Sequence, residues 1–199
     1  TLNIDTTLML VDINNGYDGF SLDNNRTTLS DEPGVDNQET AAVGITANWK
    51  ASSAFDVVTT IAAERTDIEY GYDEDWTNTA ICDGLACDSA DWGFDWWYSS
   101  TDNYLRDRGS NQLDVRLVST EEGRLGGSAS WVAGVYYHDQ SVDLTREFFD
   151  WDIYAPAVFT SDYDTERLAV YGEVAYPLAE DLTLTIGGRV EDFSGDYNG

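Results

Sequence analysis

The stretch NWKASSAFDV, residues 48–57, places Trp49 and Phe55 on either side of a few small polar residues. On both sides of this stretch apolar and polar residues alternate, and side chains on a β-strand point to opposite faces with a period of two. One face of the expected hairpin is therefore apolar and the other mostly polar. Its apolar residues are Ala41, Val43, Ile45, Ala47, Val57, Ile61 and Ala63. The pattern is typical of a half-buried soluble sheet and also of a membrane barrel.

The same alternation recurs along the chain and predicts about seven strands, with no convincing amphipathic helix. The remaining strands are expected near residues 2–10, 113–117, 129–137, 168–176 and 182–190. Because a strand is already running at the first residues, we expect the chain to be an excerpt of a longer protein.

Composition narrows the class of partner. The 199 residues carry 38 acidic and 10 basic side chains, for a net charge of −28, so nucleic acid is not an expected partner. With 42% hydrophobic and 13% aromatic residues, the chain is expected to fold. No apolar run approaches the roughly 18 residues of a membrane helix. The single histidine, His138, lies on a polar strand face, where we expect a hydrogen-bonding residue; no Ser-His-Asp set is defensible, and no enzyme is predicted.

The connections between the expected strands alternate in length. Those near residues 50–54, 119–128 and 177–181 are short, whereas 14–39, 69–108 and 145–164 are long and polar. Outer-membrane barrels have this asymmetry, with short periplasmic turns and long extracellular loops. Aromatic residues on the apolar face near the short turns, namely Trp49, Phe55, Trp131 and Tyr176, then form a girdle at the lipid headgroups. The alternative is that these rings fill the core of a soluble sandwich.

The alternation also assigns individual side chains. We expect lipid to contact Leu2, Val43, Ile45, Val57, Ile61, Val135, Val170, Val174, Leu184 and Ile186. We expect the lumen to receive Thr46, Asp114, Arg116, Glu173, Arg189 and Glu191.

Three stretches carry a resemblance to a known family. NQLDVRLVST followed by GGSASWVAGVYYHDQ, and later RLAVYGEVAYPLAEDLTLTIGGRVEDFSGDY, resemble the barrel of TonB-dependent outer-membrane receptors. The resemblance implies an all-β, antiparallel transmembrane barrel of 22 strands, an N-terminal plug and contact with a periplasmic energy-coupling protein of the TonB type. Since an odd number of strands does not close such a barrel, residues 1–199 are expected to be a partial barrel domain, with the plug and the other strands outside the chain.

The resemblance implies a function in the bacterial outer membrane. We expect a receptor for energy-coupled uptake of a scarce nutrient, an iron–siderophore-type complex, with a small-molecule chelate or an oligosaccharide as ligand. A passive porin and a soluble β-sandwich carbohydrate-binding module are the alternatives. The acidic composition by itself favours neutral or cationic cargo.

The segment between residues 69 and 108 holds the candidate ligand contacts. Its exposed aromatics beside carboxylates can stack on sugars or chelator rings, and the candidates are Trp76, Trp92, Trp96, Trp97 and Tyr98. The bland alternative is that these rings pack the loop against its neighbours.

The two cysteines, Cys82 and Cys87, are predicted to close a small disulfide loop, because the only histidine is distant and a zinc site is improbable. No cofactor and no metal site are predicted. The clusters Asp31–Asp36 and Asp73–Asp75 have the oxygen ligands that Ca²⁺ prefers, but a solvated charged surface is the default interpretation.

Overall fold

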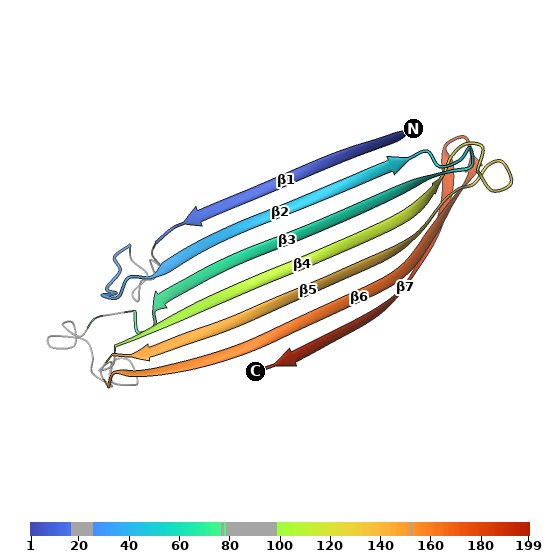
Figure 1. Cartoon of the computed structure of the whole chain (residues 1–199). Helices are drawn as coiled ribbons and strands as arrows, with labels where there is room; N and C mark the ends of the chain where they lie inside the picture. The colour runs from blue at the N-terminus through green and yellow to red at the C-terminus, as the bar shows by residue number, and fades with distance from the viewer. Residues whose placement is uncertain (17–25, 77, 79–98, 152) are drawn as a thin grey trace.

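The computed structural model describes residues 1–16, 26–76, 78, 99–151 and 153–199. In these ranges seven strands form one antiparallel sheet in chain order, as Figure 1 shows. The strands are β1 (Leu2–Asn14), β2 (Val35–Trp49), β3 (Phe55–Asp73), β4 (Ser100–Ser119), β5 (Ser130–Asp150), β6 (Ala155–Ala179) and β7 (Leu182–Asn198). The described ranges contain no helix with the length and apolar character needed to cross a membrane.

The register of the sheet confirms the two predicted faces. Ile45 pairs with Ile61, which pairs in turn with Leu113, and Val135 pairs with Val170. Thr46 falls between these rows and pairs with Thr60 on the opposite face. All residues predicted to contact lipid lie on one face, called the apolar face here, and all those predicted to face the lumen lie on the other, called the polar face.

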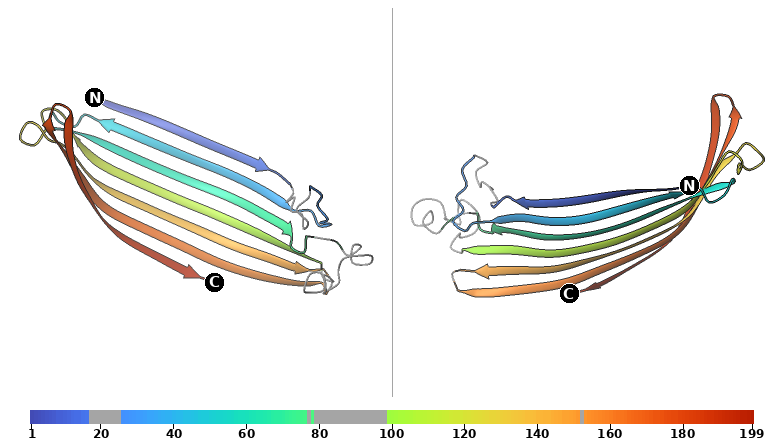
Figure 2. Two further views of the ribbon diagram at one scale, coloured as in Figure 1. Left: turned by 180° about the vertical axis from the view of Figure 1, so that it is seen from behind. Right: turned by 45° about the horizontal axis from the view of Figure 1, so that its top comes forward.

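The described residues form no second layer on either face of the sheet, and Figure 2 shows its strands as one curved layer. Among the described residues, only two apolar side chains are buried, those of Ala129 and Ala169. In contrast, Leu8 is 68% exposed and Ile186 is 67% exposed on the apolar face. A surface of this size and composition is not stable against water, so another apolar phase must cover it.

The three short connections, residues 50–54, 120–129 and 180–181, lie at one end of the sheet (Figure 1). The N-terminus lies at the same end, because the Lys50 amide donates to the Thr1 carbonyl oxygen at 2.9 Å. The first two turns touch: a Cβ atom added at Gly123 would lie 1.6 Å from the Ala54 carbonyl oxygen, so only glycine permits this approach.

The predicted aromatic girdle lies on the apolar face at this end. Trp49 pairs with Val57, and Trp131 pairs with Val174. The registers of β3 and β6 place Phe55 and Tyr176 on the same apolar face. The Trp131 ring also donates its Nε1 hydrogen to the Gly123 carbonyl oxygen at 2.9 Å. Each girdle residue therefore combines an apolar ring with a position next to a polar turn, as expected at an interface between lipid and water.

One predicted connection is wrong. Residues 145–164 were expected to form a long loop, but β5 continues to Asp150 and β6 begins at Ala155, so only 151–154 connect them. The other two long segments are also shortened by strand residues at 35–39, 69–73 and 100–108. Within 145–164 apolar residues such as Phe148 and Phe149 stand next to each other instead of alternating with polar ones. The period-two pattern therefore disappears while the backbone ladder continues, for example between Phe148 and Ala157.

Candidate functional site

Aromatic and basic side chains gather on the polar face near the long connections. The rings of Tyr72 and Tyr104 are stacked, with centroids 6.4 Å apart and planes inclined by 6°. Arg146 lies beside them and binds the carboxylate of Asp102, with Nε 2.9 Å from Oδ1 and Nη2 2.5 Å from Oδ2. We call the side chains of Tyr70, Tyr72, Tyr104, Arg106 and Arg146 the Tyr–Arg cluster.

Two guanidinium groups contact the Tyr104 ring in this cluster. The Arg106 guanidinium carbon lies 5.2 Å from the ring centroid and that of Arg146 lies 5.5 Å from it. The charge of Arg146 is neutralised by Asp102, which is buried, whereas no salt bridge reaches Arg106 in the part of the chain that the structure describes. Arg106 therefore presents a cation that is held over an aromatic ring and is available to an anion.

The arginines of the sheet are not distributed evenly between the two faces. Arg65 lies on the apolar side, whereas the polar face carries Arg106, Arg108, Arg116, Arg146, Arg167 and Arg189. In the middle of this face Arg116 Nη1 lies 3.6 Å from Asp114 Oδ1. Asp114 Oδ2 also accepts a hydrogen bond of 2.7 Å from the Tyr171 hydroxyl. The polar face thus carries most of the sheet's arginine side chains, although the net charge of the whole chain is negative.

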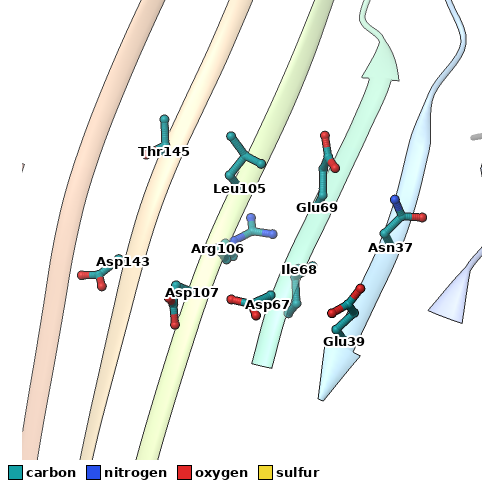
Figure 3. A pocket seen from close by; sticks show the side chains of 10 residues that line it. All are labelled: Asn37, Glu39, Asp67, Ile68, Glu69, Leu105, Arg106, Asp107, Asp143 and Thr145. Carbon is teal, nitrogen blue, oxygen red and sulfur yellow. The ribbon is translucent and has the colours of Figure 1, made fainter. Parts of the chain in front are cut away.

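Carboxylates occupy the other face of the same half of the sheet. Direct register partners run from β1 to β6 in one line, and this carboxylate row consists of Asp12, Glu39, Asp67, Asp107, Asp143 and Asp162. Four of them border the hollow in Figure 3, where neighbouring strands present their carboxylates side by side. Because like charges directly opposite each other in a sheet are destabilising, this arrangement has an electrostatic cost.

A third group of polar residues lies where β3 ends and β4 begins. The Asp31 amide donates to Asp73 Oδ2 at 3.1 Å, and the Ser100 amide donates to Asp75 Oδ1 at 3.1 Å. Burial of Asp75, and then its hydrogen bond with the Asp73 carboxyl group, raises the pKa of Asp75 to about 8. Burial and the neighbouring Asp73 likewise raise the pKa of Asp31. We call Asp31, Asp73, Asp75 and Ser100 the loop-end junction.

Of the ligand contacts predicted from the sequence, only Trp76 belongs to the described residues. It follows Asp75 directly and has a positive φ of 56°, a backbone conformation that is uncommon for a bulky residue. The other predicted residues, Trp92, Trp96, Trp97, Tyr98 and the cysteines Cys82 and Cys87, lie outside the described residues. The predictions for them are unchanged.

His138 lies on the polar face, as predicted, and its ring is stacked on that of Tyr136 at 6.4 Å. Its Nδ1 atom is buried and has no hydrogen-bond partner among the described residues. The same residues contain no group of three or more His, Cys, Asp or Glu side chains arranged as a metal site.

The sequence pattern did not predict the Tyr–Arg cluster. Asp102 and Arg146 are separated by 44 positions and meet only through the pairing of β4 with β5. A local signal was present in the alternate tyrosines Tyr70 and Tyr72 and in the alternate arginines Arg106 and Arg108. These pairs share a face in any strand, so the spacing predicts a common orientation although it does not predict the partner.

Comparisons with known proteins agree with this geometry. The family model described as "TonB dependent receptor-like, beta-barrel" matches residues 3–199. Among solved structures, the ferric yersiniabactin uptake receptor FyuA from Yersinia pestis matches 98% of this chain with a TM-score of 0.62 and 10% sequence identity. The chain spans 31% of the length of that receptor, and at this identity the likeness concerns the fold alone. No curated protein matches the sequence. Since the family match covers nearly the whole chain, the protein belongs to the TonB-dependent receptors and contains part of their β-barrel.

Proposed function

We propose that this chain is an arc of an outer-membrane receptor that takes up a scarce nutrient by energy coupling. Receptors of this family are outer-membrane transporters rather than enzymes. The observation that carries the proposal is the boundary of the apolar face, which crosses the strands at an angle.

The boundary can be followed from β1 to β7. On the apolar face, the last apolar residue before the polar part of the strand is Leu10 in β1 and Val190 in β7. The register partners of Leu10 lead across the sheet to Asp196, which lies six residues beyond Val190. The apolar zone therefore ends along a line that is oblique to the strands.

This displacement has the size expected for a membrane. Six residues of strand span about 20 Å, and six spacings between neighbouring strands span about 29 Å, so the strands are inclined by about 35° to the normal of the boundary. Strands of outer-membrane barrels are tilted by about 35 to 45°. A soluble sheet has no flat external phase that would align the boundary in this way. The missing edges of β1 and β7 then pair with further strands of the receptor.

The Tyr–Arg cluster supports a ligand with negative charge and aromatic or planar groups. Its cation over an aromatic ring, Arg106 on Tyr104, lies on the face opposite the lipid and near the long connections. A carboxylate or phenolate of a ferric chelate can accept hydrogen bonds from the Arg106 guanidinium while its ring stacks on the tyrosines. An iron–siderophore-type complex is therefore the substrate class that we favour, and the local arginines outweigh the acidic average that pointed to neutral or cationic cargo.

The remaining parts of the mechanism belong to the whole receptor. An N-terminal plug inside the barrel, and a TonB-type protein that binds it from the periplasm, would provide the energy coupling. In this arrangement the chain contributes wall and ligand contacts, while a plug outside residues 1–199 controls passage.

The membrane orientation is tested with epitope tags inserted into the intact receptor. Tags at Ser52 and Glu180, in the short turns, should be hidden from antibodies applied to intact cells, whereas a tag at Ile153 should be reached. The physical reason is that successive antiparallel strands return the chain to alternate sides of the membrane. Equal exposure of Ser52 and Ile153 would refute the barrel orientation.

The substrate class is tested by uptake of radioactive ferric chelates into cells. Arg106→Ala should weaken the uptake of an anionic chelate by about tenfold, the effect of losing one charge-assisted contact. Arg65→Ala is the matched control, because it removes the same side chain from the opposite face of the neighbouring strand. Equal effects of the two substitutions, or uptake that persists without the energy-coupling protein, would contradict the proposal; the second result would indicate a passive porin.

A further inference from the structure

Two buried carboxyl groups in the loop-end junction lack a counter-charge. Asp73 is 4% exposed and Asp75 is 1% exposed, and each uses one oxygen to accept a backbone hydrogen bond. The other oxygens, Asp73 Oδ1 and Asp75 Oδ2, are buried and receive no hydrogen bond from any other described residue. The two carboxyl groups lie within hydrogen-bonding reach of each other. Two such oxygens repel each other unless a proton or a cation lies with them.

The surroundings of this pair supply more negative charge rather than positive charge. Glu32 and Asp31 precede β2 beside Asp73, and both interact electrostatically with it. Glu74 lies between the two aspartates in sequence and accepts a hydrogen bond of 2.7 Å from the Ser100 hydroxyl. No salt bridge with lysine or arginine reaches any of these carboxylates in the described part of the chain. The described residues therefore supply no cation to this pair.

We propose that Asp73 and Asp75 together bind a hard divalent cation of the Ca²⁺ type at the loop-end junction. Carboxylate oxygens are the ligands that Ca²⁺ prefers. The two carboxylates form only part of a ligand set, and Ca²⁺ accepts six to eight oxygens, so water completes it.

A cation at this position would join three segments that are distant in sequence. Asp31 belongs to the segment before β2, Asp73 ends β3, and the Ser100 amide that binds Asp75 begins β4. The neighbouring Asn78 adds a further link, since its side-chain amide donates to the Leu29 carbonyl oxygen at 2.7 Å. Binding would therefore stabilise the ends of the strands that carry the stacked rings of Tyr72 and Tyr104. Tyr72 directly precedes Asp73, and Tyr104 lies four residues after Ser100.

Terbium luminescence provides the test, because Tb³⁺ replaces Ca²⁺ in oxygen sites and is sensitised by a nearby indole such as that of Trp76. The intact receptor in detergent, freed of metals with a chelator, is titrated with Tb³⁺, and Ca²⁺ is then added as competitor. We expect a saturable signal that Ca²⁺ removes. Asp75→Asn should weaken the apparent affinity by about tenfold or more, and Asp73→Asn combined with Asp75→Asn should abolish the sensitised signal.

Asp67→Asn is the control, since it removes one carboxylate from the same strand but from the carboxylate row. The apparent affinity of this variant for Tb³⁺ should stay within about twofold of that of the unsubstituted receptor. An equal loss in Asp67→Asn and Asp75→Asn would show diffuse attraction to acidic surface, and an unchanged affinity in Asp75→Asn would show that the ion binds elsewhere. Either result overturns the proposal.

A second measurement uses the unsubstituted receptor, so its result does not depend on whether the variants fold. Addition of Ca²⁺ should slow amide hydrogen exchange in residues 28–34 and 73–76 but not in the turn at 120–129. Unchanged exchange in the two junction segments at saturating Ca²⁺ would mean that the aspartates share a proton instead, and the proposal would be wrong.

Discussion

The two faces of the sheet differ most in the half near the long connections. On the polar face charges of opposite sign are matched: Arg146 binds Asp102, and Arg116 lies beside Asp114. On the opposite face the carboxylate row places Asp67, Asp107 and Asp143 next to one another with no cation between them in the register. The same backbone ladder therefore supports a face with specific partners and a face with repulsion.

The difference follows from what each face contacts. In the proposed receptor the polar face encloses the transport path, where water is restricted and an unpaired charge costs more, so its charges are paired or held over rings. The row on the outer side stands beyond the apolar zone, where water and salt screen neighbouring carboxylates. Three sets of substitutions and one change of salt concentration test this distinction.

The largest effect is expected from a charge on the apolar face. Ile45→Arg should destabilise the folded receptor in lipid by about 2 to 4 kcal/mol, because an arginine would face hydrocarbon. Thr46→Arg changes the adjacent residue, which faces the other way, and should have a much smaller effect. Urea unfolding in lipid vesicles, followed by the altered gel migration of folded barrels, measures both. Similar destabilisation at the two positions would refute the assignment of the faces.

A smaller loss is expected from breaking the ion pair on the polar face. Arg146→Met should leave the buried carboxylate of Asp102 with the Tyr104 hydroxyl as its one side-chain donor among the described residues, at a cost of about 1 to 3 kcal/mol. Adding Asp102→Asn to this variant should recover part of the stability, since the unpaired charge is removed. If the double variant is less stable than Arg146→Met in the same urea assay, the pairing argument fails.

The same Asp→Asn substitution should stabilise the protein on one face of the sheet and destabilise it on the other. Asp107→Asn relieves repulsion from Asp67 and Asp143 and should stabilise the protein by about 0.2 to 1 kcal/mol. Asp114→Asn weakens the contacts with Tyr171 and Arg116 and should destabilise it by about 0.5 to 1.5 kcal/mol. The two unfolding midpoints are compared at low ionic strength; a shift of both midpoints in the same direction would contradict the contrast.

The smallest effect is a dependence on salt. Raising the NaCl concentration from about 0.02 M to about 0.5 M shortens the Debye length and should stabilise the unsubstituted protein by a few tenths of a kcal/mol, through screening of the carboxylate row. The gain should be reduced in Asp107→Asn and retained in Asp114→Asn. An identical salt response in both variants would mean that the row has no measurable repulsion.

The amino-acid sequence by itself determined the seven strands, their antiparallel order and the side of the sheet on which each side chain lies. The reason is that side-chain direction in a strand has a local period of two, so Ile45 and Thr46 point to opposite sides whatever their partners are. The short turns were also predicted, because Trp49, Phe55 and the small residues between them are contiguous.

The tertiary structure alone decided which residues meet. The extent of β5 and β6 through 145–164 was hidden because apolar residues there are adjacent rather than alternating, and only the ladder shows that the strands continue. The carboxylate row depends on the register of six strands, which a shift of a single residue would destroy. Likewise Asp31 contacts Asp73 across 42 positions of sequence. Such contacts depend on pairing between distant segments, which no local period encodes.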